Sequence, residues 1–189
     1  HYPDVVKSFN EIPHNSLKSD TMMLVAGNHD ICFKQWDTYL ETFKTSVYYF
    51  IVETPLRQKD LYIMYDSADG TLGNKQLKWL QNTLEWASKQ NFRHIVAGSH
   101  THFFMRDNSQ GIATNYSIEE TYTLLRLFQS HGVDMLLTGH SHSREVTLFD
   151  ELTCIIVDSM TDEDKKPAYL VATMGDGISY EFVNLPIKL

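Results

Sequence analysis

The chain alternates short apolar runs with longer segments in which apolar residues recur at helical spacing. A short continuous apolar run is typical of a buried strand, whereas an amphipathic helix repeats apolar side chains every three or four residues. This pattern predicts helices over about residues 33–43, 74–89 and 117–130. It predicts strands over residues 21–26, 47–52, 61–65, 93–97, 133–138, 145–149, 152–158, 168–173 and 178–183. Strands that alternate with helices and are followed by antiparallel strands indicate an α/β fold.

Local signals support the ends of these elements. Ser117 and Glu120 have the spacing of a capping box at the start of the third predicted helix, and Gly132 follows its end. Residues 174–177 have the composition of a hairpin turn between the last two predicted strands.

Length and composition are those of a single globular domain over residues 1–189, with 42% hydrophobic and 21% charged residues. The formal net charge of -8 gives a surface that repels polyanions, which argues against nucleic acid and anionic membranes as partners. A small phosphorylated substrate stays compatible with this charge, because bound cations reverse the field locally. Cys32 and Cys154 are too few and too far apart for a disulfide framework.

Three of the predicted strands run directly into loops rich in His, Asn, Asp and Gly. The loops contain Gly27-Asn28-His29-Asp30, Ser99-His100-Thr101-His102 and Gly139-His140-Ser141-His142. In α/β sheets, ligands bind outside the carboxyl ends of the strands. We therefore expect the three loops to meet at one edge of a sheet and to form one site.

The side chains in these loops suit metal and acid–base chemistry. Asn28 offers a neutral oxygen ligand, His29 can donate a proton, and Asp30 can orient an imidazole. The first loop is equally compatible with a polar turn that caps the helix after it. Neutral imidazole is the commonest metal ligand, and two His-x-His pairs that each follow a strand favour a metal site over exposed loop histidines.

The order of GNHD, a strand-terminal histidine and GHSH resembles the calcineurin-like metallophosphoesterases, and the resemblance covers residues 21–183. It implies a sandwich of two mixed β-sheets flanked by helices. It also implies a hydrolase, either phosphatase or phosphodiesterase, that cleaves phosphomonoesters or phosphodiesters with two divalent ions. Imidazole and carboxamide ligands suit manganese, iron or zinc. Two ions about 3.5–4 Å apart activate water and neutralise charge on phosphorus.

The resemblance also implies individual roles. Asn28, His100 and His140 resemble ligands of the second metal, and His142 resembles a ligand of the first. His29 resembles the histidine that contacts the phosphate and assists the leaving group, with Asp30 as its orienting partner.

Two family motifs that supply the other ligands, D-x-H and G-D-x-x-D, are missing from the sequence. We therefore expect an N-terminally truncated domain that lacks a first β-α-β unit and holds at most one ion weakly. Catalysis by this chain would then be impaired, and an exposed strand edge would favour aggregation or a dimer. The alternative is a non-catalytic binding or scaffold domain, and a nuclease is disfavoured by the acidic charge.

Two further residues are candidates for substrate binding. His102 stands where many relatives have proline, as an extra phosphate contact, an accessory ligand or a partly exposed loop histidine. Arg144 follows GHSH and serves either the substrate or the surface of a strand. The expected partner is a small phosphorylated molecule whose identity stays open. The absence of a signal-peptide pattern at His1 favours the cytoplasm, although a segment upstream would leave the compartment open.

Overall fold

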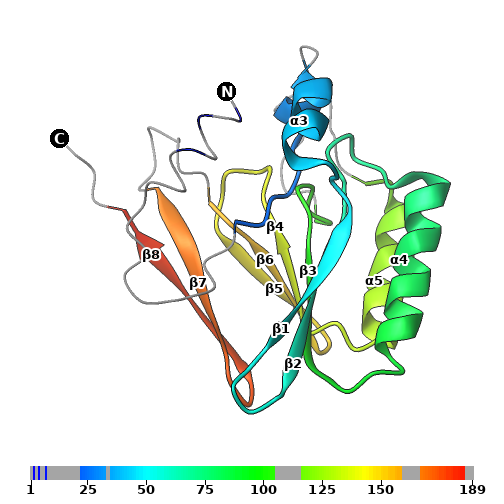
Figure 1. The fold of residues 1–189 in the computed structure, drawn as a ribbon, viewed down its shortest axis with the longest axis vertical. Coiled ribbons are helices and arrows are strands. Elements are labelled where there is room, and N and C mark those ends of the chain that lie inside the picture. The colour runs from blue at the N-terminus through cyan, green and yellow to red at the C-terminus, as the bar shows by residue number, and fades with distance from the viewer. Residues whose placement is uncertain are drawn as a thin grey trace.

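The computed structural model describes residues 2, 4, 7, 22–32, 35–104, 116–158 and 167–185 of the chain. A six-stranded mixed sheet lies in the middle, with helices on one face and a two-stranded ribbon on the other (Figure 1). The mixed α/β layering predicted from the hydrophobic pattern is confirmed. Strand and helix boundaries agree with the predicted ranges within about three residues for every element but the first predicted strand.

The central sheet has the strand order β1-β2-β3-β4-β6-β5. Its inner pairs β2–β3, β3–β4 and β4–β6 are parallel, and the outer pairs β1–β2 and β5–β6 are antiparallel. The strands are β1 (Tyr48–Glu53), β2 (Lys59–Met64), β3 (Phe92–Gly98), β4 (Met135–Thr138), β5 (Glu145–Phe149) and β6 (Leu152–Ile156). Because β2, β3 and β4 run in parallel, their carboxyl ends share one edge of the sheet, toward the end of the molecule where α3 lies (Figure 1).

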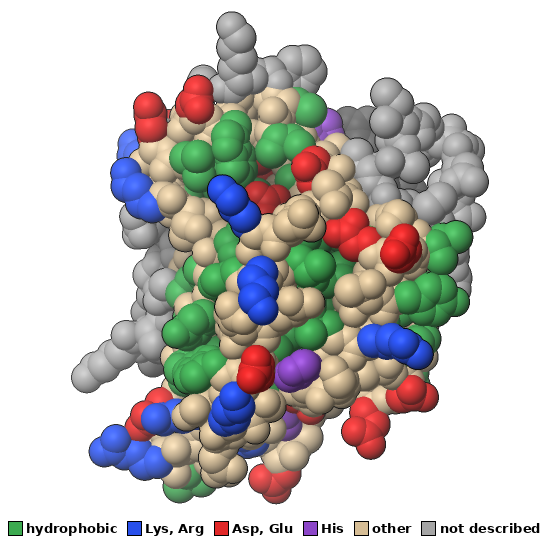
Figure 2. Space-filling model, turned by 90° about the vertical axis from the view of Figure 1, so that its right-hand side faces the viewer, with side chains coloured by type: hydrophobic (Ala, Val, Ile, Leu, Met, Phe, Trp, Pro, Cys, Tyr) green, Lys and Arg blue, Asp and Glu red, His purple; other side chains and the backbone are tan. Residues whose placement is uncertain are grey.

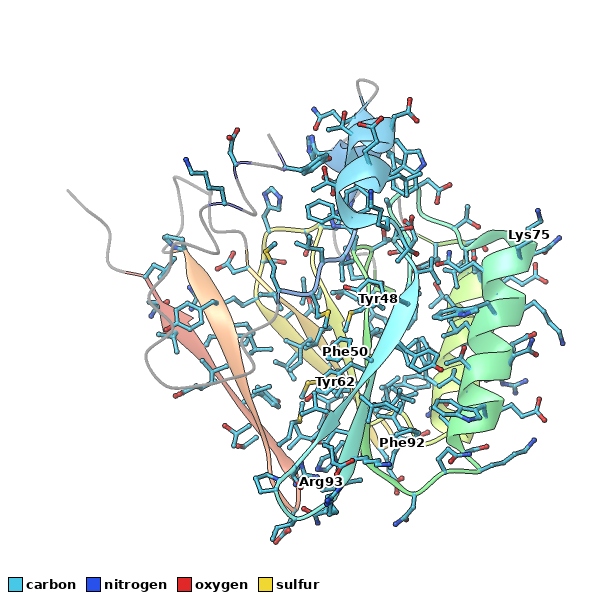
Figure 3. The ribbon with its side chains drawn as sticks, in the orientation of Figure 1. Tyr48, Phe50, Tyr62, Lys75, Phe92 and Arg93 are labelled. Carbon is cyan, nitrogen blue, oxygen red and sulfur yellow. The ribbon has the colours of Figure 1, made fainter. Side chains whose placement is uncertain are left out.

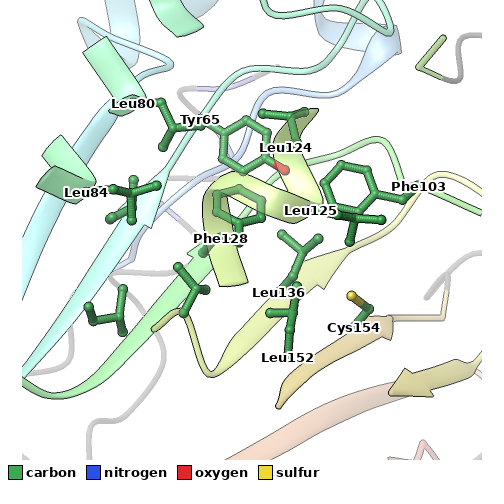
Figure 4. Close-up of a cluster of buried hydrophobic side chains, with 14 of the residues drawn as sticks. Tyr65, Leu80, Leu84, Phe103, Leu124, Leu125, Phe128, Leu136, Leu152 and Cys154 are labelled. Atoms are coloured by element: carbon green, nitrogen blue, oxygen red, sulfur yellow. The ribbon is translucent and has the colours of Figure 1, made fainter. Parts of the chain in front are cut away.

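Helices α4 (Gly73–Ala87) and α5 (Ile118–Ser130) cover one face of this sheet. Their apolar stripes pack on alternate side chains of the strands, and this cluster is the largest part of the core (Figure 4). The Ser117 hydroxyl caps α5 by accepting a hydrogen bond from the Glu120 amide at 3.1 Å, as predicted. Gly132 ends the helix region at a φ of 67°.

The other face of the sheet carries the antiparallel ribbon of β7 (Ala168–Met174) and β8 (Ile178–Asn184). Ribbon side chains such as Leu170 and Phe182 pack against a smaller buried cluster of Val96, Met135 and Ile155. Phe50 and Tyr62 stack on the same face, with ring centroids 4.8 Å apart (Figure 3). The second sheet is therefore a narrow hairpin, and it covers less of the central sheet than the helices do.

Two short helices, α2 (Asn28–Ile31) and α3 (Gln35–Phe43), lie beyond the carboxyl ends of the strands. They are held by a third apolar cluster, in which Tyr39 packs with Ala26 and Ala68. Trp36 stacks on Tyr39 at a centroid distance of 5.3 Å. Phe33, the first residue of the predicted helix, lies outside the described residues.

The strand predicted over residues 21–26 is not found, and this prediction is wrong. Residues 22–27 have no regular secondary structure. The amide and the carbonyl of Leu24 both bind the Tyr48 hydroxyl, each at 2.7 Å. The Leu24 groups that bind this hydroxyl are not available for a ladder with a neighbouring strand, and the apolar run stays irregular.

An ion pair between Arg93 and Asp60 lies at the amino ends of β2 and β3, the edge of the sheet opposite the candidate loops. The Arg93 guanidinium binds the buried Asp60 carboxylate through two nitrogens and also reaches the Met174 carbonyl of the ribbon (Figure 3). Lys and Arg side chains are interspersed with Asp and Glu over the side that α4 and α5 cover (Figure 2).

None of the helices in the described part of the chain is long and apolar enough to cross a membrane.

Candidate functional site

The loops after β3 and β4 lie side by side, because these strands are parallel neighbours. Hydrogen bonds continue the pairing beyond the strand ends. The Ser99 amide donates to the Leu137 carbonyl at 3.0 Å, and the Gly139 amide donates to the His100 carbonyl at 2.9 Å. The positions of the two His-x-His pairs are thus linked through the backbone.

His100 is the centre of the candidate site. Its Nε2 lies 2.9 Å from Asn28 Oδ1 and 3.0 Å from His140 Nδ1. The two imidazole rings are 4.9 Å apart and nearly perpendicular. A single N–H cannot point well at two acceptors. Nitrogen or oxygen ligands about 2.1 Å from one ion lie roughly 3.0 Å apart in octahedral and roughly 3.4 Å apart in tetrahedral coordination, so these separations are close to the spacing of metal ligands.

Burial favours the neutral form of these histidines. Burial, followed by the neighbouring His140, lowers the pKa of His100 to about 4. Burial, followed by His142, lowers the pKa of His140. Near neutral pH His100 is therefore a neutral imidazole with one unprotonated ring nitrogen, which is the state that binds metals.

Asp30 caps the short helix α2 rather than orienting His29. Its Oδ2 accepts a hydrogen bond from the Gly27 amide at 2.7 Å, and its Oδ1 accepts one from the Tyr2 hydroxyl at 2.6 Å. Within the described residues, no hydrogen bond joins Asp30 to His29. Consecutive side chains on a helix point about 100° apart, so the carboxylate turns toward the preceding backbone instead. The capping alternative for this loop is the one that the structure supports.

The Tyr2 hydroxyl brings a residue near the start of the chain against the GNHD loop. Burial, together with its hydrogen bond to Asp30, raises the pKa of Tyr2 to about 12. The ring also packs edge-on against Tyr39 and Phe43 of α3. This contact had no signal in the sequence.

His29 and His142 lie at the exposed rim of the site. Both are close enough to His100 and His140 to lower the pKa of those rings through charge repulsion. In the part of the chain that the structure describes, no three side chains of His, Cys, Asp or Glu form a group that could hold a metal ion. The cluster of Asn28, His100 and His140 has two imidazoles and one amide oxygen, so its donor atoms are neutral.

His102 and Arg144 have different surroundings from those of Asn28, His100 and His140. His102 is buried, with 6% of its surface exposed, and its Nδ1 has no hydrogen-bond partner. Its ring centroid lies 6.3 Å from that of His140, so a partly exposed loop histidine is not what the structure shows. Arg144 donates from Nε to Asp158 at 2.8 Å and lies 5.8 Å from the Phe182 ring. Those contacts hold its side chain toward the ribbon.

A serine that the sequence pattern did not single out lies beneath His100. The Ser67 hydroxyl oxygen accepts hydrogen bonds from the amides of His100 and Thr101, at 3.1 and 2.8 Å. Ser67 follows a predicted strand at the same sheet edge, as the three expected loops do, and that position was the available signal.

Comparison with known proteins places this geometry in context. The family model for calcineurin-like phosphoesterases matches residues 2–144. The fold is similar to GAP50, "the anchor in the inner membrane complex of Plasmodium", with a TM-score of 0.58 and 16% identity over 74% of this chain and 50% of that chain. A putative 5'-nucleotidase from Staphylococcus aureus has a TM-score of 0.43 and 18% identity, over 71% of this chain and 28% of that chain. No curated protein sequence matches. The chain spans about half the length of the GAP50 structure, and these identities bear on the fold alone.

Proposed function

The chain belongs to the calcineurin-like phosphoesterase family, and we propose that it contributes to metal-dependent hydrolysis of phosphate esters. One observation supports this most: Asn28 and His140 each place a neutral donor atom within 3.0 Å of His100 Nε2, at the carboxyl edge of the sheet. A merely structural cluster has little use for two such donors around one nitrogen. The substrate would be a phosphomonoester or a phosphodiester.

The donor set fits a divalent transition metal. Two imidazoles and one carboxamide suit manganese, iron or zinc better than magnesium or calcium. An ion held by Asn28, His100 and His140 would supply positive charge toward the phosphate oxygens and acidity to a bound water. Three neutral ligands leave that charge uncompensated, so this chain alone would hold at most one ion, and weakly. A second ion and a bridging carboxylate would need ligands from outside the described residues.

The residues around this cluster would act on the substrate directly. His29 is exposed on α2, next to Asn28, and would donate a proton to the leaving oxygen. Asp30 would contribute by fixing α2 through its bond to the Gly27 amide. His142, at the exposed rim, would be a ligand of the other ion. His102 and Arg144 would contact the phosphate, Arg144 only after leaving Asp158.

The test is metal content and ester hydrolysis measured on the same samples. Purified protein is dialysed, analysed for manganese, iron and zinc, and assayed with p-nitrophenyl phosphate and bis(p-nitrophenyl) phosphate after each metal is added. The expected result in the wild type is at most one equivalent of metal, bound once metal is added, and weak turnover, with both lost in His100→Ala. His131→Asn is the matched control, because His131 lies at the far end of α5 and bonds the Leu127 carbonyl. Absence of metal and turnover in the wild type would overturn the proposal.

A non-catalytic binding domain is the second candidate. Two observations favour it. The Asp30 carboxylate already accepts hydrogen bonds from the Gly27 amide and the Tyr2 hydroxyl. The three donors of the described cluster also include no carboxylate. Metal binding without hydrolysis of either ester, at any metal concentration, would support this candidate over the enzyme.

A further inference from the structure

Ser67 lies in the loop between β2 and α4, directly below the loop that carries His100. We infer that Ser67 is a positioning residue, which fixes the backbone of His100 and thereby aims its imidazole at Asn28 and His140. The inference rests on the proposed metal site, and it concerns what holds that site in place. Ser67 would act through the His100 backbone and would not itself bind metal or substrate.

The hydroxyl oxygen of Ser67 holds two consecutive amides. It accepts hydrogen bonds from His100 at 3.1 Å and from Thr101 at 2.8 Å. Ser67 and Thr101 are both 0% exposed, so bulk water does not reach the serine oxygen. Buried amide donors without a partner are strongly disfavoured, and the loop must therefore keep this shape while the oxygen is present.

Hydrogen bonds run in both directions between Ser67 and the His100 loop, which makes the connection more rigid. The Thr101 hydroxyl donates to the Ser67 carbonyl at 2.6 Å. The loop of Ser67 is itself tied to α4, because the Gln76 side chain binds both the amide and the carbonyl of Asp66, at 2.6 and 2.7 Å. The backbone of His100 is thus connected to a helix that packs in the main core.

The imidazole of His100 has little room to compensate for a backbone shift. A β-carbon placed on Gly27 would lie 3.0 Å from His100 Nδ1, so the ring already packs closely on the GNHD backbone. The His100 carbonyl is also held, because it accepts a hydrogen bond from the Gly139 amide at 2.9 Å. A loop released from Ser67 would move the ring relative to Asn28 and His140 together.

The experiment compares Ser67→Ala with Ser67→Thr, which keeps the hydroxyl oxygen. Ile95→Val is the stability control, because it removes one buried methyl group from β3, the strand that leads to His100. Two quantities are measured on the wild type and on each variant. The first is amide hydrogen exchange at His100 and Thr101 without metal, and the second is the dissociation constant for Co²⁺ followed by its visible absorption.

In Ser67→Ala, we expect exchange at both amides to become at least about tenfold faster and Co²⁺ to bind about 10–100-fold more weakly, the range for residues that orient metal ligands. Ser67→Thr should stay closer to the wild type in both readouts, and Ile95→Val should match the wild type. Thr101→Val supplies a second, nearly isosteric variant, which should shift both readouts in the same direction.

The outcomes separate the two proposals. If the wild type binds Co²⁺ and Ser67→Ala binds it equally well, the positioning role is wrong. The positioning role is also wrong if the exchange of His100 and Thr101 is unchanged. A third outcome is that the wild type binds no Co²⁺ while Ser67→Ala speeds hydrogen exchange at the amides of His100 and Thr101. The proposed metal site then fails, and the anchoring of the His100 loop by Ser67 is supported.

Discussion

The two loops that carry His-x-His pairs lie side by side and are built differently. The loop of His100 is largely buried, and its amides are held by Ser67. The loop of His140 and His142 is more exposed, and both histidines have a positive φ, 72° and 50°. For residues other than glycine, this left-handed conformation costs roughly 1–2 kcal/mol.

This difference indicates that the two loops have different roles in the candidate site. The first loop holds His100 on a buried, hydrogen-bonded backbone. The second loop has backbone strain at His140 and His142. Arg144, just beyond the second loop, donates to Asp158 and lies over the Phe182 ring of the ribbon. We therefore expect the first loop to set the position of a bound ion, and the second loop to adapt to it.

The largest effect should come from removing one histidine from each loop. His100→Ala should weaken Co²⁺ or Zn²⁺ binding by roughly 100-fold or more, above the 10–100-fold typical of outer-shell partners. His142→Ala should weaken it by less than about tenfold, because His142 lies at the exposed rim. Isothermal titration with each metal measures both, with His131→Asn as the control. Equal losses for His100→Ala and His142→Ala would contradict the division between the loops.

A smaller effect should follow from removing one hydroxyl from each loop. Thr101→Val deletes a buried 2.6 Å hydrogen bond and should lower the free energy of unfolding by about 1–3 kcal/mol. Ser141→Ala removes a partly buried hydroxyl contact with Ser143, and should change the free energy by less than about 0.5 kcal/mol. Urea unfolding followed by circular dichroism compares the two. A larger loss for Ser141→Ala would reverse the assignment of the rigid loop.

Replacing one histidine of each loop by glycine should change the free energy of unfolding with opposite signs. His142→Gly relieves a positive φ and should raise the free energy of unfolding by about 0.5–1 kcal/mol. His102→Gly empties a buried position whose φ is not positive, and should lower it by about 1 kcal/mol or more. Thermal unfolding of both variants at one pH measures the signs. Destabilisation by His142→Gly would show that the second loop is not strained.

The elements that sequence reasoning predicted correctly depend on local patterns. Strand β3 and helix α4 follow from an apolar run and from apolar residues at helical spacing, and the carboxyl-edge position of His100 and His140 follows from the parallel order of their strands. The strand predicted over residues 21–26 fails for a nonlocal reason, because the Tyr48 hydroxyl takes the backbone groups of Leu24.

The same distinction applies to the site. The adjacency of Asp30 and His29 in the sequence suggests a pair, but helix geometry turns adjacent side chains apart and the carboxylate bonds Gly27 and Tyr2. Ser67 escapes sequence reasoning because its partners lie 33 and 34 residues away, and a sequence pattern does not give the approach of two loops. Residue type and strand order predict which loops meet, whereas contacts between loops decide what each side chain does.

The parallel pairing of β3 with β4 has a consequence for the order of folding. The hairpin of β1 and β2 closes over a short turn, but His100 meets His140 across 40 residues and Asn28 across 72. Closing long segments costs more chain entropy, and such contacts form late. We expect a refolding chain to have most of its sheet and helices before the three donors meet, so a metal ion would bind a nearly finished protein and would slow its unfolding more than it speeds its folding.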